Sequence, residues 1–249
     1  MKLKSIVKYN LNSLKKSILI YYSIFITVCI CLVLLSKIGT VNTSGLEISS
    51  VIFIFVVGLN SFKENFYFMK SNNVSRKDFI YGTAVSMIPV TLFMSFIDII
   101  INRIYNIFIK CPTIYEYTYT KFINDTQWSI NTWVQNNSIG TLFNTFTFQF
   151  AMCLASFSLG FLITIIYYKS NKLMKLVVSV SPFLLIILLN IIAINFPDFT
   201  MKIGLFIQTI FGWNNNNNSY AAVLTFIVLF IVFIGISRVL TRKAIIKQR

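Results

Sequence analysis

Ionisable side chains inside apolar stretches are the residues of this sequence that could do chemistry in a membrane. Asp98 lies near the end of an apolar run over residues 79–101, and Arg103 follows just beyond that run. A charged side chain at membrane depth is costly and is often functional. The pattern predicts an ion pair between Asp98 and Arg103 near the outer interface, which is either structural or part of an outer gate or cargo contact.

Polar amides are the second group of candidates inside apolar runs. Asn144, Gln149 and Asn190 each lie in such a run, and Gln149 is the nearest to a membrane midplane. Interhelical hydrogen bonds explain amides at these depths, and the alternative is that they line a cargo path. Pro182 predicts a kink in the fifth apolar run, which suits either a gate or plain packing. These residues, with Asp98 and Arg103, are the candidate cargo path or gate.

The residue types that catalysis and cofactor binding need are largely missing. The sequence has no histidine, which removes the commonest general base and metal ligand near neutral pH. Its four cysteines form no CxxC pair and no zinc-binding spacing. Neither GxxxxGK[ST] nor GxGxxG occurs. We therefore expect no catalytic residue, metal or cofactor in this chain. If its function consumes ATP, a partner subunit binds the ATP and Mg²⁺.

The composition predicts the elements that position these residues. The chain has 249 residues, of which 56% are hydrophobic and only 12% are charged, whereas soluble domains carry about 25% charged residues. Six apolar segments are predicted to cross a bilayer, each as a helix. They are residues 17–36, 48–62, 79–101, 139–168, 176–196 and 219–237. The prediction is an all-α membrane protein with a single transmembrane domain over residues 1–249, which excludes a soluble enzyme, a disordered protein and a disulfide scaffold.

The distribution of basic residues predicts the topology. Most of the 22 lysines and arginines lie before the first span, after the second and fourth spans, and after the sixth. By the positive-inside rule, both termini are cytoplasmic. The net charge of +15 therefore follows the lipid surface, and no nucleic-acid partner is expected. Heavy use of Asn, Ile, Lys and Phe is typical of an AT-rich bacterial genome, so we expect a multi-pass protein of the bacterial cell membrane.

Segments outside the spans carry further expectations. Residues 1–16 combine lysines with apolar residues at helical spacing, which predicts an amphipathic helix in the inner interface. The alternative is a simple helical extension of the first span. Two outer loops are predicted, at 102–138 and 197–218. The second contains an apolar piece too short to span, which predicts a short re-entrant or interfacial helix before the sixth span.

The loop over residues 63–78 is the most informative segment outside the membrane. Phe62, Phe66 and Met69 fall on one stripe of a short helix, and Ser75 and Asp78 have the spacing of a helix-capping pair before the third span. An exposed apolar cytoplasmic helix is unfavourable unless something covers it. The helix therefore either lies flat in the inner leaflet or docks into a groove on a soluble partner.

The order of these parts resembles the small permeases of the type-two family of ATP-binding cassette (ABC) transporters. Those have an N-terminal interfacial helix, six spans, a coupling helix between spans two and three, and short re-entrant helices before span six. The phrase Phe62-Lys63-Glu64-Asn65-Phe66, followed by Val74-Ser75-Arg76-Lys77-Asp78-Phe79, is similar to the coupling loop of that family. The resemblance implies two copies of an ABC ATPase subunit and a second permease chain, identical or related. The residues expected to couple to the ATPase are Glu64, Phe66, Phe68, Met69, Val74, Ser75, Arg76 and Lys77.

The leading hypothesis is a permease subunit of an ATP-driven exporter, since members of that family are common in peptide export and self-immunity. Its cargo would be an amphipathic peptide or a hydrophobic compound. The alternative is a non-transporting scaffold or immunity protein that holds a toxin or partner at the membrane. An ion-coupled transporter is disfavoured by the sparse membrane carboxylates and the lack of an internal repeat.

Overall fold

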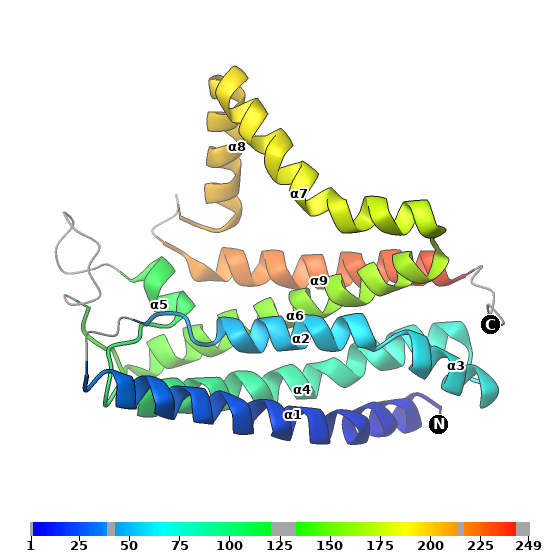
Figure 1. Cartoon of the computed structure of the whole chain (residues 1–249), viewed down its shortest axis with the longest axis horizontal. Coiled ribbons are helices and arrows are strands. Elements are labelled where there is room, and N and C mark those ends of the chain that lie inside the picture. The colour runs from blue at the N-terminus through cyan, green and yellow to red at the C-terminus, as the bar shows by residue number, and fades with distance from the viewer. Residues whose placement is uncertain (1, 39–42, 121–132, 214–216, 243–249) are drawn as a thin grey trace.

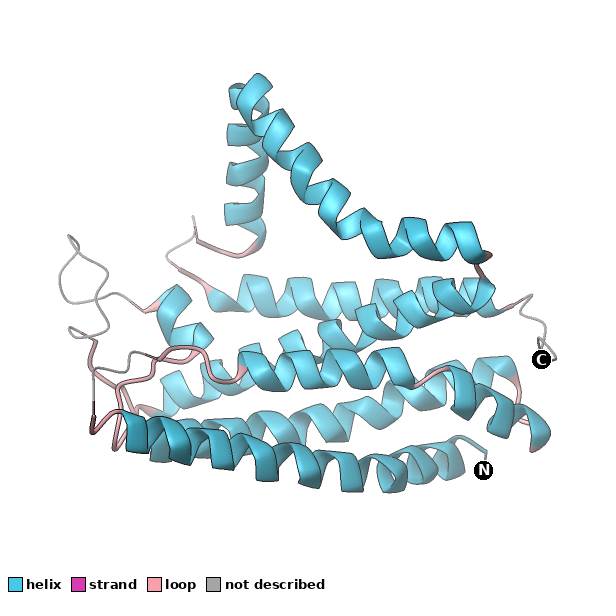
Figure 2. Cartoon of the chain, viewed as in Figure 1, coloured by secondary structure: helices cyan, strands magenta, loops and turns pink. Residues whose placement is uncertain are grey.

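A computed structural model describes residues 2–38, 43–120, 133–213 and 217–242, and every regular element among them is a helix (Figure 1, Figure 2). The helices are α1 (Lys2–Leu35), α2 (Ile48–Asn60), α3 (Lys63–Ser71), α4 (Arg76–Tyr105), α5 (Ile114–Tyr119), α6 (Ile139–Lys169), α7 (Lys172–Asn195), α8 (Pro197–Ile210) and α9 (Ser219–Thr241). Residues 121–132 of the predicted outer loop 102–138, and the basic tail beyond residue 242, lie outside the described residues.

Membrane-spanning length is common among these helices. Five of the described helices are long and apolar enough to cross a membrane, and the number is six if α2 and α3, which meet at a bend of 44°, form one span. This confirms the all-helical membrane class and its approximate number of spans. α2 alone has 13 residues, or about 20 Å at 1.5 Å per residue, so the predicted second span is short by itself.

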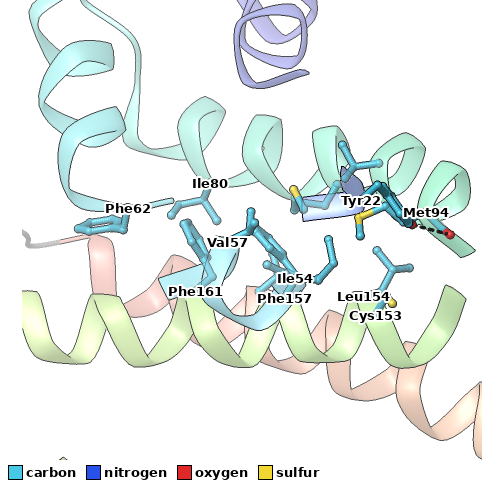
Figure 3. Packing of buried hydrophobic residues seen from close by; sticks show 14 of the residues in the cluster. Tyr22, Ile54, Val57, Phe62, Ile80, Met94, Cys153, Leu154, Phe157 and Phe161 are labelled. Atoms are coloured by element: carbon cyan, nitrogen blue, oxygen red, sulfur yellow. Dashed lines mark hydrogen bonds between the residues drawn. The ribbon is translucent and has the colours of Figure 1, made fainter. Parts of the chain in front are cut away.

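The bundle is built around α6, which packs against α2, α4 and α9, while α1 packs along α4. Figure 3 shows side chains of α6 facing those of α2 and α4 in the apolar core. α1 begins, α3 lies and α9 ends at the same end of the bundle (Figure 1). We call this the basic end, because exposed lysines of α1 and α3 gather there, including Lys4, Lys8, Lys63 and Lys70.

Two glycines let α2 and α6 approach each other at backbone distance. A Cβ atom added to Gly58 of α2 would lie 2.4 Å from the carbonyl oxygen of Phe157, and one added to Gly160 of α6 would lie 2.4 Å from the carbonyl oxygen of Phe55. Real Cβ atoms do not approach carbonyl oxygens this closely. The pair of helices therefore depends on both glycines, as small residues at helix crossings in membranes do.

The first helix corrects one expectation. α1 runs without a break through 34 residues, or about 51 Å at 1.5 Å per residue, and its early turns pack along α4. Ile6 contacts Gly82, and the Asn10 amide donates a hydrogen bond of 3.1 Å to Ser86. The prediction of a separate interfacial helix over residues 1–16 is therefore wrong, and the alternative of a helical extension of the first span holds. The reason is that buried contacts with α4 continue the same face of the helix.

The α7–α8 segment stands apart from the bundle. Figure 1 shows α7 leaving the bundle obliquely and α8 running across the direction of the other helices. No residue of α7 or α8 is buried in this chain. Pro182 lies inside α7, where proline removes a backbone hydrogen bond and favours a kink, and Figure 1 shows that α7 is bent. The 14 residues of α8 agree with the predicted short helical piece before the last span.

Candidate functional site

A carboxylate near the α5 end of the bundle collects hydrogen bonds from three other helices. Asp98 of α4 is 4% exposed. It accepts hydrogen bonds from the hydroxyls of Tyr22 in α1 and Ser50 in α2, both at 2.9 Å, and from the amide nitrogen of Gln149 in α6 at 3.2 Å. One acceptor thus joins four helices. We call these four residues and Glu47, which Gln149 also contacts, the buried polar cluster.

The predicted ion pair between Asp98 and Arg103 is wrong. Arg103 instead pairs with Glu116 of α5 at 2.8 Å. The reason is helical geometry, because residues three or four apart are neighbours on a helix and residues five apart are not. Glu116 is fully buried and also forms a capping box with Thr113 at the start of α5. Arg103 therefore fastens α5 to the end of α4.

Glu47 is a member of the cluster that the sequence did not single out. Its carboxylate accepts a hydrogen bond from the backbone N–H of Ile114, at the first turn of α5, and its backbone carbonyl accepts one of 3.3 Å from Gln149. The side chain is buried, and its second oxygen, Oε2, has no hydrogen-bond partner among the described residues. Burial, with a smaller contribution from the charges of Asp98 and Glu116, raises the pKa of Glu47 from 4.5 to about 7.

This pKa shift predicts a pH dependence of stability. A carboxyl group whose pKa is higher in the folded state binds its proton more tightly there, so its contribution is complete below pH 4.5 and is lost as pH rises through about 7. We expect the melting temperature of the purified protein to fall between pH 5 and pH 8. Glu47→Gln should flatten this dependence and melt higher than the wild type at pH 8.

Glu64→Gln is the matched control for this measurement, because Glu64 is an exposed glutamate of α3. It should leave the pH profile of melting unchanged. Identical profiles for Glu47→Gln and wild type would contradict the assignment of this titration to Glu47.

The predicted path residues do not all come together. Asn144 donates a hydrogen bond of 3.1 Å to the Tyr115 hydroxyl and accepts one of 2.7 Å from the Tyr220 hydroxyl, so it links α6 to α5 and α9. Gln149 belongs to the buried polar cluster. Asn190 is exposed on α7 and its amide donates to the Ile186 carbonyl of its own helix. Asn190 and Pro182 therefore lie on α7, away from Asp98 and Gln149.

The α3 region confirms part of the prediction and corrects another part. A short helix, α3, does lie between α2 and α4, and the Ser75 hydroxyl caps α4 by accepting a hydrogen bond of 3.0 Å from the backbone N–H of Asp78. Phe66 and Met69, however, are only 2% and 5% exposed. Phe66 lies in an aromatic cluster, with ring centroids 4.9 Å from Phe62, 5.6 Å from Phe79 and 6.1 Å from Tyr168.

This burial means that Phe66 and Met69 offer no surface to a partner. Their predicted role as apolar contacts with a partner is corrected, because the stripe faces the core of its own chain, where Phe66 contacts Phe79 of α4 and Tyr168 of α6. Val74 is half-buried against the same core. Arg76 is also engaged, since its guanidinium donates a hydrogen bond of 2.5 Å to the carbonyl of Arg242 at the end of α9. The positive charge of Arg76 is favourable at this position, because the C-terminal end of α9 carries the negative end of the helix dipole.

The surface that α3 leaves open is small and mixed in character. Phe68 is 47% exposed, with its ring stacked on Tyr9 of α1 at 4.8 Å. Glu64 and Lys77 are exposed on either side of the turn that follows α3. Of the residues predicted to couple to a partner, these three and Ser75 are exposed. The Ser75 hydroxyl is already used in the cap of α4.

The structure has two features that could serve a function: the hydrogen bonds of the buried polar cluster and the exposed face of α3. Among the described residues there is no group of three or more cysteine, aspartate or glutamate side chains that could hold a metal ion. The candidate sites are the buried polar cluster near α5 and the exposed face of α3 at the basic end. Comparisons of the chain with family models, curated proteins and solved structures found no match.

Proposed function

We propose that this chain is the permease subunit of an ATP-driven exporter in a bacterial cell membrane. ATP and Mg²⁺ would bind to a separate ATPase subunit, of which two copies are expected. Two permease chains, identical or related, would pair around a path for an amphipathic peptide or a hydrophobic compound. The proposal draws on the sequence resemblance and on the geometry of α3.

The anchoring of α3 is the single observation that carries this proposal. Its apolar stripe packs into the core through the buried side chains of Phe66 and Met69. Glu64 and Phe68 are exposed at the basic end. A movement of that surface would be transmitted to the spans, because the close-packed aromatic contacts between α3 and the core are nearly incompressible. A helix that simply lay on lipid would turn its apolar stripe toward the membrane instead of toward its own chain.

Two further features support the arrangement of partners. α7 carries no charged residue after Lys175 and buries no residue in its own chain, so its surface is available to lipid or to a second permease chain. The buried polar cluster joins α1, α2, α4 and α6 through Asp98, and Glu47 connects it to the start of α5, which makes it a joint of the bundle. We assign Asp98 and Gln149 to this joint and leave the cargo path to the surfaces around α7 and α9.

A charge reversal on the exposed face of α3 tests the proposal. The tagged protein is purified in mild detergent from its native host, and the chains that accompany it are identified. We expect a stoichiometric soluble chain that carries GxxxxGK[ST]. Glu64→Arg should reduce the amount of that chain at least several-fold, because it places a positive charge where the partner meets a carboxylate.

Asp198→Arg is the matched control, since Asp198 is an exposed acidic residue in the first turn of α8, far along the chain from α3. It should leave the partner bound. Recovery of the wild-type chain alone in several mild detergents would refute the exporter proposal and favour a membrane scaffold. Equal partner recovery with Glu64→Arg and Asp198→Arg would refute the docking face.

A further inference from the structure

The contacts between α1 and α4 fix the level of each α1 residue against the spans. The two helices lie side by side and both begin at the basic end (Figure 1). Three contacts between them each join residues that are 76 apart in the sequence: Ile6–Gly82, Asn10–Ser86 and Tyr22–Asp98. Because this separation is constant, the helices advance together, residue by residue. Residues 4–17 of α1 are therefore level with residues 80–93 of α4, inside the predicted span 79–101.

The level of the bilayer on α4 agrees with its level on α9. Arg76, just before the span 79–101, donates its hydrogen bond to the carbonyl of Arg242, which follows the span 219–237. The charged ends of these two spans therefore lie at the same level, at the basic end. The lysines of α1 instead continue along α4 as far as Lys16, which is level with Leu92, close to the middle of the span.

The exposed surfaces of α1 and α4 differ in character at this shared level. Every exposed residue of α1 between positions 4 and 17 is polar: Lys4, Lys8, Asn12, Lys15, Lys16 and three serines. We call these residues the polar face. The exposed residues of α4 between positions 80 and 93 are all apolar or aromatic, and they include Val85, Ile88 and Leu92. The surface of α4 is therefore suited to lipid, whereas the polar face is suited to water.

A lysine exposed at this depth needs water around its ammonium group. Hydrocarbon does not solvate a charge, and ionisable residues at membrane depth face a bundle interior or a water-filled cavity. Among the described residues, no carboxylate forms a salt bridge with any lysine of the polar face. Lys16 lies about 20 Å along α1 from the level of Phe79, at 1.5 Å per residue, so its side chain cannot reach the headgroups by snorkelling.

We propose that the polar face lines a water-filled vestibule, which opens at the basic end and admits anions to about the middle of the membrane. Lys8 and Lys16 lie one helical turn on either side of Asn12, and α1 contains no acidic residue, so the charge along the vestibule is positive throughout. Lysine side chains that line a pore select anions. Beyond the polar face the next exposed residues are Leu19 and Ile20, where the vestibule ends. This inference does not depend on the proposed transport function, since it needs no ATPase and no second permease chain.

Cysteine reactivity at level-matched positions tests for water in the vestibule. The full-length chain with Cys31→Ser, which removes the exposed native cysteine, is reconstituted in phospholipid nanodiscs and treated with a membrane-impermeant anionic methanethiosulfonate. Asn12→Cys and Lys16→Cys should react about a hundredfold faster than Ile88→Cys and Leu92→Cys, because only a hydrated thiolate is nucleophilic. Ile88 and Leu92 are exposed on α4 at the levels of Asn12 and Lys16, so each pair compares two surfaces at one depth.

Two results of this measurement would overturn the vestibule. Slow reaction at all four positions would show that lipid or another chain covers the polar face. Equally fast reaction at all four positions would show that α4 lies outside the bilayer at this level. All four substituted residues are exposed, so the variants should melt close to the parent protein, which is checked before the reagent is added.

A cross-link shows whether α1 stays on α4 while the polar face is accessible. Asn10→Cys combined with Ser86→Cys places two thiols where a hydrogen bond of 3.1 Å joins the native side chains, and oxidation in the same nanodiscs should link them. Asn12→Cys combined with Ser86→Cys should not link, because Asn12 is on the exposed side of α1. No link in the first pair would show that this part of α1 leaves α4 to lie at the membrane surface, and would overturn the vestibule.

Charge selectivity tests the role of the lysines. Asn12→Cys should react faster with the anionic reagent than with a cationic methanethiosulfonate, when each rate is divided by that of a free thiol in water. Lys8→Gln combined with Lys16→Gln should lower this ratio several-fold. Lys172→Gln combined with Lys175→Gln removes the same charge from exposed positions at the start of α7 and should leave the ratio unchanged. Equal ratios for the two double variants would overturn the selectivity for anions.

Discussion

Phe66→Asp is expected to unfold the basic end of the protein. Phe66 is 2% exposed and lies among three other aromatic rings. Truncating a buried phenylalanine to alanine costs about 3–5 kcal/mol, and a carboxylate at the same place adds the cost of an unpaired buried charge. Because whole domains are stable by only about 5–15 kcal/mol, we expect aggregation on size-exclusion chromatography or a large fall in melting temperature.

Phe68→Asp is the matched control, since it makes the same chemical change two residues away. Phe68 is 47% exposed and has one aromatic contact, the stack on Tyr9, which is worth about 0.5–1.5 kcal/mol. This variant should fold and melt close to the wild type. It should nevertheless bind the proposed ATPase more weakly. Similar melting temperatures for the two variants would show that the stripe of α3 does not face its own core.

Gly160→Ala is expected to separate α2 from α6. The added Cβ atom would lie 2.4 Å from the carbonyl oxygen of Phe55, and this oxygen cannot move without the backbone of α2. Overpacking in a dense interior costs about 1–3 kcal/mol, and a clash with backbone lies at the upper end of that range. Gly58→Ala makes the reciprocal clash with Phe157, so the double variant should be the most damaged.

Gly235→Ala provides the control within the same kind of helix. A Cβ atom added at Gly235 of α9 meets nothing within 4 Å, so alanine should be neutral or stabilise the helix by about 0.5–1 kcal/mol. Thermal unfolding in detergent, followed by circular dichroism, measures all four variants. If Gly160→Ala melted as high as Gly235→Ala, the close approach of α2 and α6 would be disproved.

The sequence by itself determined which segments are long apolar helices and where several of them begin and end. The predicted spans 139–168 and 219–237 differ by only a few residues from α6 and α9, because a bilayer requires about 20 consecutive apolar residues and charges mark the ends. The capping role of Ser75 was also predictable, since it depends on the chemistry of residues three apart in the chain. These features are local, and local spacing is what a sequence displays directly.

Only the tertiary structure decided which groups meet. Asp98 bonds to residues of α1, α2 and α6, while Arg103 turns to Glu116, and no spacing within α4 could select partners on other helices. Likewise, periodicity placed Phe66 and Met69 on one stripe but could not say whether that stripe faces a partner or its own core.

Burial decided the remaining question of what each polar residue does. Glu47 directly precedes α2, and its hydrogen bonds with Ile114 and Gln149 make it part of the joint near α5. The physical reason is that a buried polar group must find hydrogen-bond partners wherever the packing of helices supplies them. The apolar pattern therefore fixes which segments become helices, and the packing of those helices fixes which side chains form the sites.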